Sequence, residues 1–104
     1  MVPEPVERRL AAILSADVAG YSRLVAADEE ATMRRLAAYR EDVALLVRQH
    51  RGRLADFTGD NFLAEFPSAL DAVQAAVEIQ RVLGALNADV APEARMEFRG
   101  APTA

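Results

Sequence analysis

The segment RLADFTGDNFLAEF, residues 53–66, contains two short runs of strand-forming residues on either side of a turn. Gly59, Asp60 and Asn61 separate the two runs, and all three residue types favour tight turns. Pro67 follows the second run and ends it, because proline has no amide hydrogen to donate to a neighbouring strand. The segment therefore predicts a β-hairpin, around which the rest of the chain can be placed.

A long amphipathic helix is predicted before the hairpin. Asp28 is its expected N-cap, the acids that follow suit the positive end of the helix dipole, and Gly52 is its expected stop. The expected buried face repeats at helical spacing and consists of Met33, Leu36, Ala37, Val43, Ala44 and Val47.

A second long helix is predicted after the hairpin. Ser68 and Asp71 form a capping box at its start. Its expected buried face consists of Ala69, Ala72, Val73, Ala76, Ile79, Leu83 and Leu86.

The remaining segments complete an α+β pattern. Residues 10–18 read as a buried strand, residues 21–27 as a short helix and residues 95–99 as the start of a further strand. The expected order is βααββαβ. It predicts a ferredoxin-like fold with an antiparallel-rich sheet and two long helices on one face.

Composition excludes several classes of protein. The 104 residues include no cysteine, so a disulfide framework and a thiolate metal site are excluded, and a cytoplasmic location is favoured. The net charge of −4 argues against a nucleic-acid partner. No apolar run approaches the roughly 20 residues of a spanning helix, so we expect no membrane segment in this chain.

Two acids stand where the predicted fold needs none. Asp17 ends the first strand, and Asp60 sits at the tip of the hairpin. The two can approach if the first strand lies beside the hairpin, and two close carboxylates repel unless a cation lies between them. Hard divalent ions such as Mg²⁺ take carboxylate oxygens together with substrate phosphates. A helix cap at Asp17 and an ordinary turn residue at Asp60 are the structural alternatives.

Both acids lie in segments that resemble a known family. LSADVAGYSRL, residues 14–24, is similar to the first metal motif of bacterial class III adenylate/guanylate cyclases, and GDNFLAEF, residues 59–66, is similar to the second. The resemblance implies a partial catalytic domain over residues 8–99, the N-terminal portion only, after a flexible leader at residues 1–7. The domain would convert ATP or GTP to a 3′,5′-cyclic nucleotide and pyrophosphate as a homodimer or as a heterodimer with another cyclase domain.

The resemblance also implies roles for individual residues. Asp17, Asp60 and the Val18 carbonyl would bind two Mg²⁺ or Mn²⁺ ions. The triphosphate would be held by the backbone amides of Ala19, Gly20, Tyr21 and Ser22. Asp56 stands three residues before the motif glycine, where adenylate cyclases usually carry a base-selecting lysine and guanylate cyclases carry an acid. The choice between ATP and GTP stays open.

The sequence departs from the family after residue 99. Residues 100–104, GAPTA, read as an atypical tail, and the later residues that contact the base and stabilise the transition state do not follow. We therefore expect the isolated chain to lack useful cyclase activity. A non-catalytic pseudo-cyclase that dimerises or binds nucleotide is the main alternative, and a plain ferredoxin-like interaction domain is the third.

Overall fold

The computed structural model describes residues 12–90 and 92–103. The predicted leader, residues 1–7, lies outside them, as do Leu10 and Ala11 of the expected first strand. The elements in chain order are β1 (Ala12–Val18), α1 (Tyr21–Ala27), α2 (Glu29–Gln49), β2 (Arg53–Thr58), β3 (Asn61–Phe66), α3 (Ala69–Asn87), the 3-10 helix η2 (Pro92–Ala94) and β4 (Phe98–Thr103). This is the predicted βααββαβ order.

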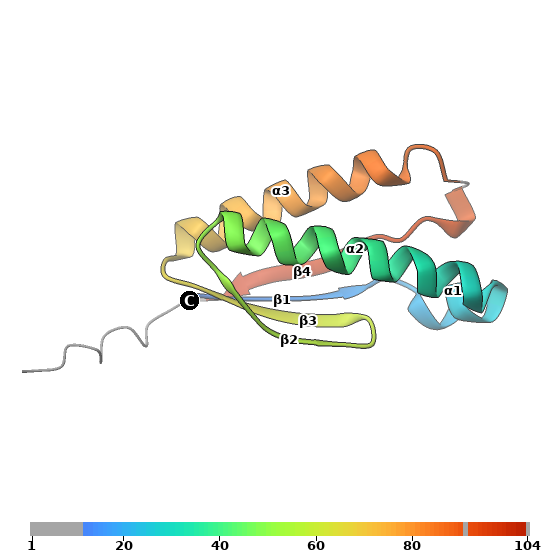
Figure 1. Cartoon of the computed structure of the whole chain (residues 1–104), viewed down its shortest axis with the longest axis horizontal. Coiled ribbons are helices and arrows are strands. Elements are labelled where there is room, and N and C mark those ends of the chain that lie inside the picture. The colour runs from blue at the N-terminus through green and yellow to red at the C-terminus, as the bar shows by residue number, and fades with distance from the viewer. Residues whose placement is uncertain (1–11, 91, 104) are drawn as a thin grey trace, which may run out of the picture.

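The strands form one sheet in the order β2-β3-β1-β4, with every neighbouring pair antiparallel. The two long helices, α2 and α3, lie on the same face of the sheet (Figure 1). The opposite face carries no helix in the described part of the chain, and we call it the open face. The α+β class and the arrangement of the helices are as predicted.

Alternation along the strands separates the core from the open face. Leu14 and Val18 of β1 and Phe62, Ala64 and Phe66 of β3 are buried among the helices. Neighbouring residues of a strand point to opposite faces of the sheet. Ser15 and Asp17 of β1 and Asn61 and Leu63 of β3 therefore belong to the open face.

Short polar contacts begin both long helices as the sequence predicts. The Asp28 carboxylate accepts a hydrogen bond of 3.1 Å from the Ala31 amide, and the Ser68 hydroxyl accepts one of 3.1 Å from the Asp71 amide. The buried hydroxyl of Thr32 donates to the Leu24 carbonyl at 3.0 Å. This bond ties α1 to the first turn of α2, which fixes the backbone that follows β1.

The buried faces of the two helices are rotated from the predicted ones. Tyr39 and Leu46 of α2 are buried, as are Ala75 and Asn87 of α3. Residues that we expected to be buried but that are exposed are Met33, Ala37, Ala69, Val73 and Leu86. Both helices carry apolar residues around much of their circumference, so packing on the sheet decides which flank is covered. Tyr39 and Asn87 can be buried because their polar atoms are hydrogen-bonded to each other.

The last strand also differs from the prediction. β4 begins at Phe98 rather than at Arg95 and extends over residues 100–103, which we expected to form an atypical tail. These residues pair with β1, with Gly100 opposite Ala16 and Thr103 opposite Ile13. The exposed backbone edge of β1 provides hydrogen-bond partners that composition alone does not reveal. Pro102 is tolerated because β4 is an edge strand.

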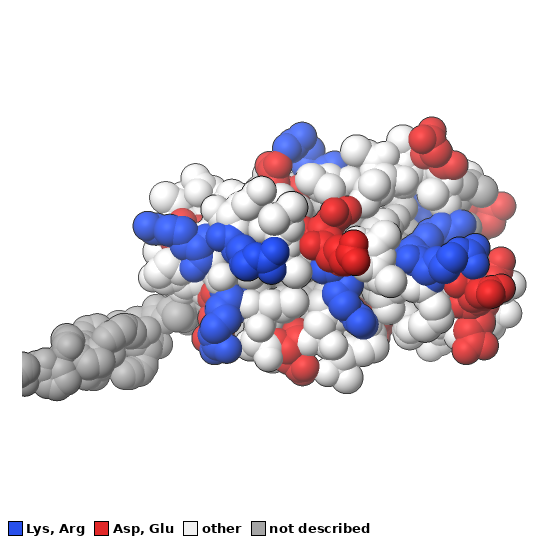
Figure 2. Space-filling view, viewed as in Figure 1, with Lys and Arg blue, Asp and Glu red and all other residues white. Residues whose placement is uncertain are grey.

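The surface carries both signs of charge. Basic and acidic side chains are interspersed on the face drawn in Figure 2. No helix among residues 12–90 and 92–103 combines the length and the apolar character that crossing a membrane requires.

Candidate functional site

The sheet register brings the two predicted acids to the same end of the adjacent strands β1 and β3. Asp17 on β1 pairs with Asn61 on β3, and Asp60 immediately precedes Asn61 in the hairpin turn. Paired Cα atoms of antiparallel strands lie about 4.5–5.5 Å apart. The backbone at Asp17 therefore lies close to the backbone at Asp60, although 43 positions separate the two residues in the chain.

Both acids are half-buried, and Asp17 belongs to the open face. Its neighbour Val18 is 1% exposed and points into the core, so the Asp17 side chain points the other way. Its partner Asn61 is exposed on the same face. The site therefore opens away from α2 and α3.

The Val18 carbonyl is oriented by a hydrogen bond on the other side of its peptide. The Ala19 amide donates to the Glu97 carbonyl at 2.7 Å, toward the β4 side of β1. No cis peptide bond occurs in the described residues, and in a trans peptide the carbonyl and the amide hydrogen point in opposite directions. The Val18 oxygen therefore points toward the β3 side, where Asp60 precedes β3.

The loop after β1 has fewer available amides than the sequence suggests. The Ala19 amide is already bonded to Glu97, so in this arrangement it is not available to a phosphate. Gly20 adopts a left-handed conformation with φ of 65° and is the N-cap of α1 without a side-chain cap. The amides of Tyr21 and Ser22 lie in the first turn of α1, where no intrahelical partner exists. The Tyr21 side chain packs against the core.

Asp56 also reaches the open face. The register shifts between Leu54 and Asp56, which leaves Ala55 as an extra residue and pairs Asp56 with Leu63. Leu63 is 41% exposed and stands beside Asn61 on that face. The Thr58 hydroxyl donates to the Asp56 carboxylate at 2.8 Å. Asp56 lies two strands from β1 in the row of Ser15, which is two residues before Asp17, so the Cα atoms of Asp56 and Asp17 are roughly 12 Å apart.

The oxygen atoms at this end of the strands are suitable ligands for a hard cation. Two carboxylates and a backbone carbonyl are oxygen ligands of the kind that Mg²⁺ and Mn²⁺ prefer. Within residues 12–90 and 92–103, no three His, Cys, Asp or Glu side chains cluster as a metal site. A cation here would complete its coordination with water or substrate oxygens, as Mg²⁺ usually does.

Two buried, hydrogen-bonded polar residues are absent from the sequence-based prediction. Asn87 is the last residue of α3 and is 7% exposed. Tyr39 donates to the Asn87 side-chain oxygen at 2.7 Å. Asn87 follows Ile79 and Leu83 at intervals of four, and this spacing is the one signal that places it on the buried face.

Comparisons with known proteins agree with the geometry. No family model matches the chain. A curated protein of Rhizobium meliloti (strain 1021), named "Putative adenylate cyclase 3", is 47% identical over 96 residues, which cover 91% of this chain and 16% of that protein.

Solved cyclase structures share the fold. The crystal structure of an adenylate/guanylate cyclase/hydrolase from Silicibacter pomeroyi has a TM-score of 0.79 and 34% identity, covering 88% of this chain and 54% of that one. The guanylyl cyclase Cya2 has a TM-score of 0.77 and 25% identity, with 88% and 52% covered. This chain thus spans about half the length of these solved proteins. It belongs to the class III adenylate/guanylate cyclase catalytic-domain family and corresponds to part of that domain.

Proposed function

We propose that this chain is the cation-binding part of a nucleotidyl cyclase domain, which forms a 3′,5′-cyclic nucleotide and pyrophosphate from ATP or GTP. The observation that carries the proposal is the register of β1 with β3, which makes Asp17 and Asp60 neighbours at one end of these two strands. The similarity to the protein named "Putative adenylate cyclase 3" and to solved cyclases supports the same assignment.

In this proposal Asp17, Asp60 and the Val18 carbonyl hold two Mg²⁺ or Mn²⁺ ions. Bound there, the ions would stabilise the charge that develops at the α-phosphate and assist ionisation of the ribose 3′-hydroxyl. The chain's own residues would bind and orient the substrate. The Gly20, Tyr21 and Ser22 amides would hold phosphate oxygens, and the open face would receive the nucleoside.

Asp56 is the proposed contact to the base. Its carboxylate lies on the open face near the row of Asp17, and Thr58 holds one of its oxygens. The second oxygen can accept a hydrogen bond from an amino or imino group of the base. Both ATP and GTP remain candidate substrates, because adenine and guanine each present such a donor.

A partner subunit belongs to the proposal. The open face lacks a covering layer in the described residues and exposes Leu63, an apolar side chain that is 41% accessible. A second copy of the chain, or another cyclase domain, would supply groups that complete the site. We place the reaction in the cytoplasm, where nucleoside triphosphates are available.

A non-catalytic role is the second candidate. The chain spans 54% of the Silicibacter protein's length, so a domain with cation and nucleotide contacts but without turnover is consistent with that coverage. We expect the isolated chain to bind without measurable cyclisation.

Calorimetry with Mn²⁺, alone and with non-cyclisable ATP or GTP analogues, tests the proposal. Asp17→Ala and Asp60→Ala should each abolish Mn²⁺ binding, whereas Glu41→Ala, at an exposed acid on α2, should leave it unchanged. Absence of Mn²⁺ and nucleotide binding by the wild-type chain would contradict both candidate functions. Cyclic nucleotide production by the purified chain would favour the enzyme over the non-catalytic module.

A further inference from the structure

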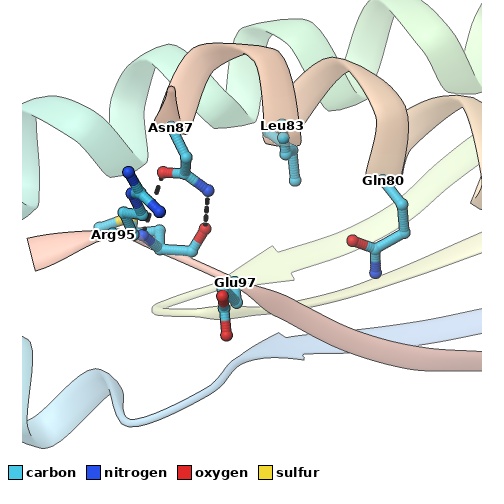
Figure 3. Close-up of a pocket in the computed structure, with 7 residues that line it drawn as sticks. Gln80, Leu83, Asn87, Arg95 and Glu97 are labelled. Carbon is cyan, nitrogen blue, oxygen red and sulfur yellow. Dashed lines mark hydrogen bonds between the residues drawn. The ribbon is translucent and has the colours of Figure 1, made fainter. Parts of the chain in front are cut away.

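A buried hydrogen-bond network lies behind the candidate cation site. Asn87 at the end of α3 accepts from the Tyr39 hydroxyl at 2.7 Å and donates to the Met96 carbonyl at 2.6 Å. Its oxygen also accepts from the Met96 amide at 3.3 Å. Figure 3 shows the Asn87 side chain directed at the backbone of residues 95–97. Asn87 thus joins α2, α3 and the segment that leads into β4.

The network is buried, and its side-chain polar atoms are all hydrogen-bonded. Tyr39 is 3% exposed, Asn87 is 7% exposed and Met96 is fully buried. No buried side-chain nitrogen or oxygen among the described residues lacks a partner. An adjacent pocket of about 370 Å³ is lined by Gln80, Gly84, Arg95 and Glu97 among others, but both polar atoms of Asn87 are engaged with Tyr39 and Met96. The role of Asn87 therefore lies in the backbone that it holds.

That backbone leads directly to the cation site. Met96, held by Asn87 at both its amide and its carbonyl, is followed by Glu97, whose carbonyl accepts from the Ala19 amide at 2.7 Å. The Ala19 amide and the Val18 carbonyl belong to one trans peptide and point in opposite directions. Fixing Glu97 therefore fixes the direction of the Val18 oxygen.

We propose that Asn87 is a positioning residue for the cation site, acting through Met96, Glu97 and the Ala19 amide on the Val18 carbonyl. This inference rests on the proposed function for its cation. Its structural part, the control of the peptide between Val18 and Ala19, does not depend on a bound ion. Supporting residues behind a metal's ligands commonly change affinity by about 10- to 100-fold when they are lost.

Amide hydrogen exchange by NMR, without metal, tests the structural part. Asn87→Ala should lower the protection of the Ala19 amide by at least about tenfold relative to amides paired between β1 and β3, because local opening of that bond then precedes global unfolding. Leu83→Ala is the matched control. Leu83 is buried on the same helix and lines the same pocket, but it carries no polar atom in its side chain. This variant should lower both protections together.

Calorimetry with Mn²⁺ on the same variants tests the consequence. Asn87→Ala should weaken Mn²⁺ binding about tenfold, and Leu83→Ala should not change it in the folded protein. If Asn87→Ala does not fold, Tyr39→Phe is used in its place. The protection of the Ala19 amide, relative to amides paired between β1 and β3, should then fall roughly threefold.

The outcomes separate this inference from the proposed function. The positioning role would be overturned, whatever the metal result, if Asn87→Ala and Leu83→Ala lost Ala19 protection equally. It would also be overturned if Tyr39→Phe, where that variant is needed, lost none. Selective loss of Ala19 protection without wild-type Mn²⁺ binding would support the control of this peptide and contradict the proposed function. Selective loss with unchanged Mn²⁺ affinity would overturn the role of Asn87 toward the cation.

Discussion

The two carboxylates of the candidate site are carried by backbone segments that are held in different ways. Asp17 lies on β1, an inner strand, and the Ala19 amide just beyond it is anchored through Glu97 to the buried Asn87 network. Asp60 lies at the tip of the β2–β3 hairpin, next to Gly59 at φ of 58°, where a Cβ would meet open space. One segment is positioned by tertiary packing and the other by local turn geometry.

This contrast predicts that the two acids tolerate a longer side chain unequally. Asp17→Glu should weaken Mn²⁺ binding about 100-fold, because an anchored backbone cannot retreat by the length of one methylene. Asp60→Glu should weaken it only about threefold, because the open turn can adjust. Calorimetry at fixed pH and ionic strength measures both values. Equal losses for the two variants would remove the distinction between an anchored and an adjustable ligand.

Replacing the two left-handed glycines with alanine compares the segment after β1 with the hairpin turn in terms of unfolding free energy. Gly20→Ala and Gly59→Ala should each cost about 1–2 kcal/mol of unfolding free energy, because an L residue at positive φ is strained. Gly20→Ala should cost more, since its new Cβ would lie 2.9 Å from the Arg23 guanidinium and would displace that side chain. Urea denaturation gives the free energies.

Gly84→Ala is the matched control for the glycine pair. Gly84 lies within α3, and a Cβ there meets no atom within 4 Å. Alanine should therefore stabilise the chain by about 0.5–1 kcal/mol through its higher helix propensity. A cost at Gly84, or a larger cost at Gly59 than at Gly20, would contradict the assignment of open space and strain to these positions.

The difference between the segments also explains what the sequence could predict. The hairpin, its turn and both helix caps depend on residues within a few positions of one another, and the local pattern predicts them correctly. The Asn87 network joins residues 39, 87 and 96, so no local pattern contains it. Arg40 is a similar case. It interrupts the apolar pattern of α2, yet its guanidinium lies 4.6 Å from the centroid of the Phe57 ring.

The approach of Asp17 to Asp60 could be predicted only in outline. The order of elements favours β1 beside the hairpin, but the register that pairs Asp17 with Asn61 is set by burial of Leu14, Val18, Phe62 and Phe66 together. The extent of β4 could not be predicted, because Gly100–Thr103 carries little strand propensity and pairs by filling the edge of β1. The buried contacts among Tyr39, Asn87 and Met96 could not be predicted either, because they join residues far apart in the sequence.

Alkaline pH tests the anchored segment through Tyr39. Burial raises the pKa of the Tyr39 hydroxyl above its usual value, and the positive charge of Arg35 opposes that rise. The stabilisation that follows is complete below the unfolded pKa of about 10 and is lost as pH rises through the folded pKa. Tyr39→Phe should remove this alkaline loss and cost about 1 kcal/mol at neutral pH, through the lost hydrogen bond to Asn87. An unchanged alkaline limb in denaturation curves of the variant would assign the loss to another group.

Acid pH tests the end of the sheet that lies away from both carboxylates, and the expected effect is the smallest. Asp71 lies in the first turn of α3, shortly after β3 ends at Phe66, which pairs with the start of β1. A hydrogen bond from the Arg51 guanidinium is the main cause that lowers the pKa of Asp71, with a smaller contribution from the Ser68 hydroxyl, while desolvation opposes the shift. The stabilisation is present above the unfolded pKa of about 4 and is lost as pH falls through the lower folded value. Salt should weaken this stabilisation, because Arg51 is 72% exposed.

Asp71→Asn should flatten the acid limb of stability. It should leave the relative protection of the Ala19 amide unchanged, since the Asn87 network does not include this end of the sheet. A change at Ala19 in this variant would show that the anchoring of the cation site extends along the whole of β1.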